Sequence, residues 1–419
     1  MTAAFLAALL LALATEGWLA ARQISHVRAR REEVPAPFRD SVRVETHRRA
    51  ADYTAAGERL GLASRAWRAA LLLGWTLGGG LDLLDRAWGA TGWGAVARGT
   101  GFLLSALLLD ALFRAPLAAW RVFRLDARFG FNRTTPRLFL ADRLKGAALL
   151  ALLVLCLAPP LLLLMSRAGA AWWLFAWGGW ALLSLLLHWI VPRFVAPWFH
   201  RFTPLAEGEV SGRIEDLLAR AGFPRHALFV MDGSRRSTHA NAFFAGLGRS
   251  RRIVLFDTLL KALTPGEVEA VVALDLAHFR LRHVAKGIAL STLLAGAGFA
   301  LLAFLLEREW FFAGLGASRP SPHVGLLLFA WVAPVLFFLL EPALAAWSRR
   351  HEFQADAFAA RYSDAGALAR ALVRIHEHNG ATLTPDPLHS AFHASHPPPG
   401  ERSDALLRTA AGSAYDGAR

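Results

Sequence analysis

Long apolar segments dominate this sequence and limit the folds open to it. Of its 419 residues, 55% are hydrophobic, and the mean hydropathy is +0.36. A helix needs about 20 apolar residues to cross a bilayer. Runs of about that length occur at Thr2–Ala20, Ala69–Leu84, Gly101–Trp120, Ala147–Met165, Ala171–Val191, Gly287–Leu306 and Val324–Trp347. We therefore predict a mainly α, multi-pass integral membrane protein with about seven transmembrane helices.

The charged residues between these runs indicate an orientation. The formal net charge is +14, and arginines gather after the first run and between the third and fourth, as the positive-inside rule expects of cytoplasmic loops. We expect the N-terminus outside and the C-terminus in the cytoplasm. No nucleic-acid-binding module is recognisable, so we expect no nucleic-acid partner. The preference for arginine over lysine favours a bacterial cytoplasmic membrane.

The largest polar insertion runs from about Pro192 to Lys286, between the fifth and sixth apolar runs. Within it, Glu209–Ala221 is typical of an amphipathic helix. Short strands are predicted at Ala227–Met231 and Arg252–Phe256, with Asn241–Phe244 a possible third between them. A second polar region, 348–419, follows the seventh run. Because the two polar regions flank a helical hairpin, they should meet on one side of the membrane.

The segment Thr264–Lys286 has the start signal of a helix, followed by an altered zinc motif. Thr264 is a suitable N-cap, Pro265 follows it, and Glu267 lies three residues after the cap. Zinc proteases with such a helix carry HExxH, in which two histidines bind the metal and the glutamate activates its water. The corresponding positions hold Leu274, Asp275 and His278. Because a single histidine on an apolar helix is most often a packed residue, this pattern needs context.

A second candidate group follows the seventh apolar run. A catalytic zinc usually has three protein ligands, and Glu352 could supply one from a later helix. Asp356 lies one turn further on the same face, where it could orient a ligating histidine. By spacing alone, the alternative is that both acids belong to a solvated helix face.

Several stretches of the sequence, taken together, are similar to one protein family. They are AADYT near Asp52, FGFNRTTPRLFLAD from Phe129, MDGSRRSTHANAFFAGLGRSRRIVLFDTLL from Met231, RRHEFQAD from Arg349 and PLHSAFHASHPPPGER from Pro387. The chain resembles type 1 CAAX prenyl proteases, which are integral-membrane zinc metalloproteases with about seven transmembrane helices around a large chamber. The resemblance implies an N-terminal membrane domain with five spans, 1–191. It also implies a small α+β, zincin-like metalloprotease domain with two further spans, 192–419.

The resemblance also implies roles for individual residues. His278 and Glu352 would be metal ligands, and Asp356 would support them. The remaining implied roles belong to Asn241, which would hold the substrate backbone as an added strand, and to His396 and Arg402, which would stabilise the substrate carbonyl. Without the resemblance, these three would be read as a turn residue, a loop histidine and a surface cation.

The sequence departs from the family motif at positions that bind the metal and activate water for hydrolysis. Leu274 has no lone pair, so two expected ligands remain where three are needed. Asp275 is one methylene shorter than glutamate, which withdraws the carboxylate by roughly 1 to 1.5 Å and costs about 100-fold if the geometry is not restored. Ala277 replaces a glycine. Asp275, His278 and Glu352, helped by His283 or His396, could still form a weaker site, but Asp275 would then cease to be the general base.

Three hypotheses follow. The first is a catalytically impaired family member that binds lipidated or membrane-associated polypeptides, with zinc absent or weakly bound. The second is an active zinc metalloendopeptidase with an altered metal site. The third is a structural membrane subunit whose motif residues are unused. Under the first two hypotheses, the expected partners are a peptide or protein, with or without a prenyl group, and the lipid bilayer.

Overall fold

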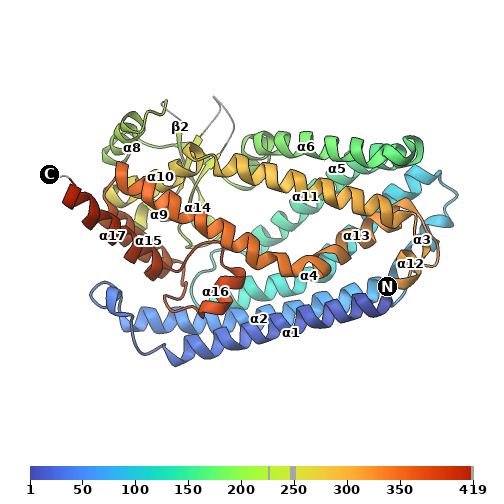
Figure 1. Ribbon diagram of the computed structural model, residues 1–419, viewed down its shortest axis with the longest axis horizontal. Coiled ribbons are helices and arrows are strands. Elements are labelled where there is room, and N and C mark those ends of the chain that lie inside the picture. The colour runs from blue at the N-terminus through green and yellow to red at the C-terminus, as the bar shows by residue number, and fades with distance from the viewer. Residues whose placement is uncertain (225–226, 246–251, 417–419) are drawn as a thin grey trace.

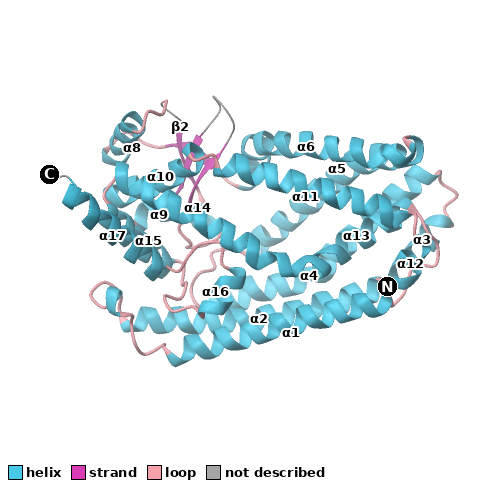
Figure 2. Cartoon of the chain, in the orientation of Figure 1, coloured by secondary structure: helices cyan, strands magenta, loops and turns pink. Residues whose placement is uncertain are grey.

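The computed structural model describes residues 1–224, 227–245 and 252–416. Helices form most of the chain (Figure 2). In the first half these are α1 (Thr2–Ala29), η1 (Ala36–Phe38), α2 (Val44–Trp75), α3 (Gly80–Gly89), α4 (Ala95–Trp120), η2 (Arg121–Asp126), α5 (Pro136–Arg167), η3 (Gly169–Ala171), α6 (Trp172–Ile190), η4 (Val191–Val195) and α7 (Ala196–Phe199). Long helices α1 and α2 lie side by side along the lower edge of the molecule in Figure 1.

The second half alternates polar elements with further long helices. Its elements are β1 (Phe202–Pro204), α8 (Glu209–Arg220), β2 (Ala227–Met231), η5 (Gly233–Arg235), β3 (Ala242–Ala245), β4 (Arg252–Phe256), α9 (Asp257–Ala262), α10 (Pro265–Arg280), α11 (His283–Leu306), α12 (Glu309–Gly314), α13 (Pro322–Phe337), η7 (Phe338–Leu340), α14 (Glu341–Tyr362), α15 (Ala365–His378), α16 (Pro387–His393) and α17 (Pro399–Asp416). The predicted helix at Glu209–Ala221 and the three predicted strands are confirmed, with small shifts of their ends.

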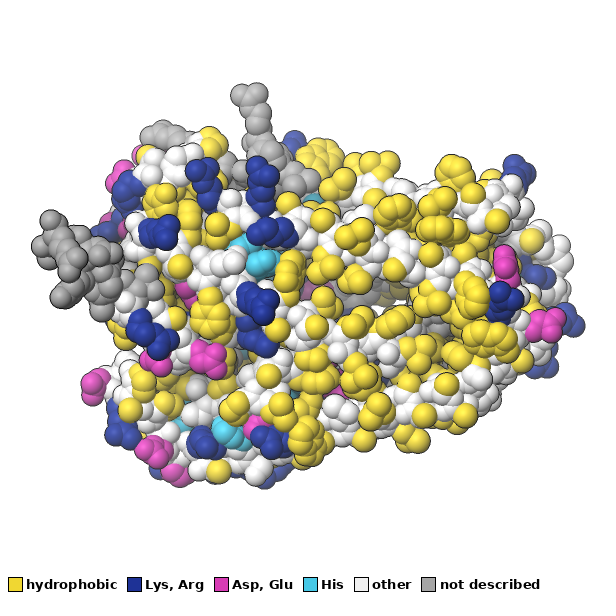
Figure 3. Space-filling model, viewed as in Figure 1, with side chains coloured by type: hydrophobic (Ala, Val, Ile, Leu, Met, Phe, Trp, Pro, Cys, Tyr) yellow, Lys and Arg dark blue, Asp and Glu magenta, His cyan; other side chains and the backbone are white. Residues whose placement is uncertain are grey.

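Six helical stretches among the described residues are long and apolar enough to cross a membrane. They are Thr2–Ala29, Ala95–Asp126, Pro136–Arg167, Gly169–Phe199, His283–Leu306 and Pro322–Tyr362. Figure 3 shows hydrophobic side chains covering much of the face over these helices, while lysines and arginines gather toward the end where α10 and α14 meet. Exposed Leu11, Leu182 and Leu293 belong to this apolar surface, which suits contact with lipid.

The predicted span at Ala69–Leu84 is wrong as one continuous helix. Helix α2 ends at Trp75, and a separate helix, α3, begins at Gly80. Gly79 between them has a φ of 77°, a conformation that glycine adopts without a Cβ penalty. Gly78 also lies so close to the backbone of Gly74 that a Cβ would collide with it. The glycine run therefore breaks the apolar segment into two helices.

A four-stranded sheet joins the polar elements at one end of the molecule. The strand order is β1-β2-β4-β3, with β2 parallel to β4 and the other pairs antiparallel. Strand β1 was not predicted, because three residues ending in Pro204 give no alternating pattern. The sheet leaves β3 as an edge strand beside α10.

Helix α10 lies at the centre of the larger hydrophobic core of this end. Its residues from Val268 to Ala277 are almost all buried, and they pack against α8, α14 and α15. The predicted start is confirmed: the Thr264 N–H donates to Glu267 Oε2 at 2.9 Å in a capping box. Glu267 also pairs with Arg374 of α15 at 2.8 Å. The local start signal thus also fixes α10 against its neighbour.

Candidate active site

Helices α10 and α14 bring His278 and Glu352 together, as the sequence predicted from the two polar regions. His278 Nε2 lies 3.4 Å from Glu352 Oε1. The other carboxylate oxygen, Oε2, is contacted by His396 Nδ1 at 2.9 Å and by Arg402 Nη1 at 3.2 Å. Glu352 is only 4% exposed. Both oxygens of this buried carboxylate are therefore held by nitrogen atoms of side chains.

Arg402 connects Glu352 to the other acid on the same helix face. Its Nε and Nη2 donate to Asp356 Oδ2 and Oδ1 at 2.8 and 2.6 Å, a bidentate pair in which both side chains are buried. The sequence suggested that Asp356 orients a histidine and that Arg402 reaches the substrate carbonyl. In the structure, Asp356 accepts hydrogen bonds from Arg402, and three guanidinium nitrogens contact the two acids. These two suggested roles remain predictions.

Leu274 lies one turn before His278 on α10 but belongs to the hydrophobic core. It is 8% exposed and is part of the cluster that includes Val271 and Ala277. At this position a histidine would direct a nitrogen toward His278, since residues four apart share a helix face. The leucine cannot bind a metal and instead packs against the apolar side chains of the core.

Asp275 faces a pocket and is poorly hydrated. One of its oxygens, Oδ2, is buried and has no hydrogen-bond partner within the described part of the chain. Burial, and then the charge of Glu352, raise the pKa of Asp275 to about 8. The side chain is consequently protonated in most molecules at neutral pH, and a protonated carboxyl cannot accept a proton from water.

Both ring nitrogens of His278 have partners. Nδ1 lies 3.2 Å from Nδ1 of His283, and His283 Nε2 lies 3.0 Å from Gln354 Oε1. The ring of His283 also stacks on His351, with 4.0 Å between centroids. Burial lowers the pKa of His278, which favours the neutral ring. Sequence reasoning named His283 only as a substitute ligand and missed Gln354 and His351, although RRHEFQAD places both beside Glu352.

A pocket of about 530 Å³ adjoins Asp275 and His278. Its walls are mostly apolar and include Phe243 and Phe244 of β3, together with Trp180 of α6. Asn241 precedes β3; its carbonyl accepts from Phe256 N–H at 3.1 Å, and its Oδ1 accepts from Ala242 N–H at 2.9 Å. Strand β3 pairs with β4 on one side only among the described strands.

Comparison with known proteins identifies the ancestry of this arrangement. Residues 23–201 match the model for the CAAX prenyl protease N-terminal region with five membrane helices, and residues 204–410 match peptidase family M48. The CAAX prenyl protease 1 homolog of Oryza sativa subsp. japonica is 35% identical over 306 residues, covering 73% of this chain and 72% of that protein. This chain belongs to the CAAX prenyl protease family.

Two further CAAX prenyl protease relatives support the assignment over most of the chain. CAAX prenyl protease 1 of Saccharomyces cerevisiae is 32% identical, covering 74% of this chain and 72% of that protein. The crystal structure of S. mikatae Ste24p matches with a TM-score of 0.87 and 29% identity, covering 96% of this chain and 97% of that one. The chain is thus a multi-pass integral membrane protein with the polytopic fold of this protease family.

M48 peptidases are zinc metalloproteases, but the side chains here do not fit a zinc ion held by three protein ligands. His278 and Glu352 remain, whereas Leu274 occupies the third position. Across the described residues, three ligand atoms from histidine, cysteine or acids lie within 4.8 Å of one another only at Glu16, Glu341 and His393. Asp275 does not complete such a trio with His278 and Glu352.

Proposed function

We propose that this chain is a CAAX prenyl protease family member that binds membrane-associated or lipidated polypeptides without metal-dependent hydrolysis. The observation that carries the proposal is the state of Glu352. Its two oxygens are contacted by His278, His396 and Arg402, so both oxygens of the buried acid already have partners within the chain. A metal bound at Glu352 would have to replace one or more of these contacts.

Two side chains of α10 also support this proposal. Leu274 adds apolar packing where a ligand would stand, and Asp275 is held mainly protonated, with a pKa of about 8. A metal site with two ligands loses affinity by orders of magnitude, and a protonated acid does not activate water. Binding, by contrast, requires neither group.

The elements for binding an extended peptide remain. Among the described strands, β3 lies at the sheet edge, so a peptide could add beside it as a further strand through main-chain hydrogen bonds. We propose that Asn241 holds that peptide at the start of β3. The apolar pocket behind Phe243 and Phe244 would then accept a hydrocarbon chain.

We also propose the orientation and the domain division predicted above. The α1–α2 and α4–α5 connections lie at the same end of the molecule as the sheet (Figure 1). These connections carry many of the arginines; Arg236 beside the sheet pairs with Asp142 of α5 at 2.8 Å. The positive-inside rule puts this end in the cytoplasm, with domains 1–191 and 192–419 in a bacterial cytoplasmic membrane.

A peptide-binding and cleavage assay tests the proposal. Detergent-purified protein is incubated with a farnesylated peptide and with its unmodified counterpart, and binding and intact peptide are measured. We expect tighter binding of the farnesylated peptide and no cleavage. Asn241→Ala should weaken binding by about fivefold, the value of one hydrogen bond. Thr203→Ala, which alters the opposite edge strand, is the matched control and should bind normally.

The alternative is an active zinc metalloendopeptidase with an altered site. Cleavage by the unmodified chain that is lost in Glu352→Gln would support this alternative and would contradict the proposed loss of hydrolysis. Equal binding by the Asn241→Ala and Thr203→Ala variants would instead remove the proposed role of β3. The two results therefore test separate parts of the proposal.

A further inference from the structure

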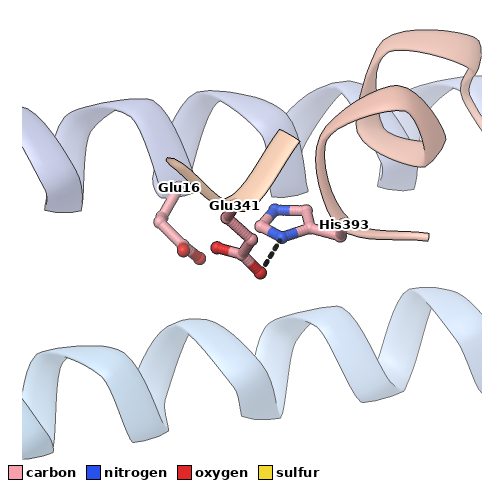
Figure 4. Close-up of side chains that lie close together, drawn as sticks. All are labelled: Glu16, Glu341 and His393. Carbon is pink, nitrogen blue, oxygen red and sulfur yellow. Dashed lines mark hydrogen bonds and ion pairs between the residues drawn. The ribbon is translucent and has the colours of Figure 1, made fainter. Parts of the chain in front are cut away.

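A second group of polar side chains lies away from the HExxH position, where α1, α14 and α16 come together; two of its members are partly buried and one is exposed. Glu16 comes from the middle of α1, Glu341 begins α14 and His393 ends α16 (Figure 4). One possible ligand atom from each lies within 4.8 Å of the others. Residues more than 300 positions apart thus converge on one point.

Two of these residues lie in candidate membrane spans, where an ionisable side chain is costly. Glu16 belongs to the span Thr2–Ala29, and Glu341 belongs to Pro322–Tyr362. They line a pocket of about 680 Å³ between α1, α2, α4 and α13, together with Arg65 and Trp331. This pocket gives water and small ions access to the group.

The existing contacts leave ligand positions in this group open. His393 Nδ1 lies 3.1 Å from Glu341 Oε1, and this is the one ion pair of Glu341 with any described residue. His393 Nε2 is buried and has no hydrogen-bond partner in the described part of the chain. Arg65 pairs with Glu16 through Oε2, so Oε1 is not used by that pair.

We propose that Glu16, Glu341 and His393 bind a first-row divalent cation such as Zn²⁺. One imidazole and two carboxylates are a suitable ligand set for such ions. Ligand atoms at about 2.0–2.2 Å from one ion lie at most about 4.4 Å apart. The group therefore needs to contract by only a few tenths of an ångström, which rotation of the partly exposed Glu341 side chain supplies.

The site is distinct from the pair His278 and Glu352. Glu341 and Glu352 are eleven residues apart on the same helix, or about 16 Å at 1.5 Å per residue. The cation would tie α16 to α1 and α14, just before the loop that carries His396. It would thus fix a segment whose side chain contacts Glu352.

Zinc uptake by the full-length protein in detergent tests this site. The protein is stripped with a chelator, dialysed against micromolar Zn²⁺ and measured by elemental analysis. We expect about one equivalent in the unmodified chain. Glu341→Gln and His393→Ala should each weaken Zn²⁺ binding at least tenfold, because three ligands become two. His389→Ala is the matched control, since His389 lies on the same helix and pairs with Glu58 instead.

The outcomes separate this site from the proposed function. Zinc at background in the unmodified chain overturns the proposed site and leaves the proposal about hydrolysis intact. Full zinc retained in both Glu341→Gln and Glu352→Gln has the same meaning. Loss of the equivalent in Glu352→Gln but not in Glu341→Gln would contradict both. Thermal melting of each variant shows that it is folded, and Glu341→Gln keeps the shape of the side chain.

Discussion

Glu352 and Glu341 lie on the same helix but differ in how their charge is balanced. Glu352 is 4% exposed and is contacted by His278, His396 and Arg402. The Glu341 side chain is 45% exposed, and its one ion pair among the described residues is with His393. Both oxygens of Glu352 are contacted by side chains, whereas Glu341 Oε2 has no ion pair with any described residue. If both proposals hold, the motif position is the poorer metal site of the two.

The strongest way to reverse this difference is to restore the motif on α10. Leu274→His with Asp275→Glu supplies a third ligand and a longer acid, so zinc affinity should rise by orders of magnitude. Zinc content measured in the Glu341→Gln background should increase by about one equivalent, with some peptide cleavage. Leu274→Phe, which keeps the position apolar, is the control. A folded double variant that gains no zinc would mean that the surrounding site cannot accept the metal.

The second test removes the cation that balances Glu352. Arg402→Ala leaves Glu352 and Asp356 buried without their guanidinium, which should lower the free energy of unfolding by about 3–5 kcal/mol. Arg370 offers the matched control, because it is 60% exposed and its pairs with Glu267 and Asp364 are long. Arg370→Ala should cost about 0–1 kcal/mol. Equal melting temperatures for the two variants would remove the charge-balance argument.

A smaller effect is expected at Asp275, and it depends on pH. Because the folded protein holds the pKa of Asp275 at about 8, above the unfolded value near 3.9, folding favours the protonated acid. The contribution of this carboxyl group to the free energy of unfolding is complete below about pH 4 and is lost as the pH rises to 8. Asp275→Asn should therefore have a higher melting temperature than the unmodified chain at pH 8. The gap should narrow at pH 5; a gap independent of pH would contradict the raised pKa.

Local chemistry in the sequence was enough to predict several parts of the fold. The cap at Thr264, the strands around Ala227 and Arg252 and most of the apolar spans depend on neighbouring residues alone. The glycines Gly78–Gly80 did not enter the prediction from the sequence, because the number of apolar residues around them is high. The close backbone approach and the positive φ in this run nevertheless end the helix.

Long-range partners could not be predicted in the same way. The motif brought His278, Glu352, His396 and Arg402 into one hypothesis, but it gave no indication that Arg402 binds Asp356, 46 residues away. Glu16 and His393 share no motif and meet only because α1 packs near α14 and α16. Such pairs depend on the packing of helices, which spacing within one segment does not contain.

The most direct test is the zinc content of the Glu341→Gln variant, compared with Glu341→Gln combined with Glu352→Gln. The first substitution removes one ligand from the group of Glu16, Glu341 and His393, so a full equivalent of zinc that remains bound must lie elsewhere. We predict background zinc in both proteins, because Leu274 leaves two ligands where three are needed and both oxygens of Glu352 already have partners within the chain. Nearly one equivalent of zinc in the single variant, lost in the double variant, would show a working metal site at Glu352 and would contradict the proposed loss of hydrolysis.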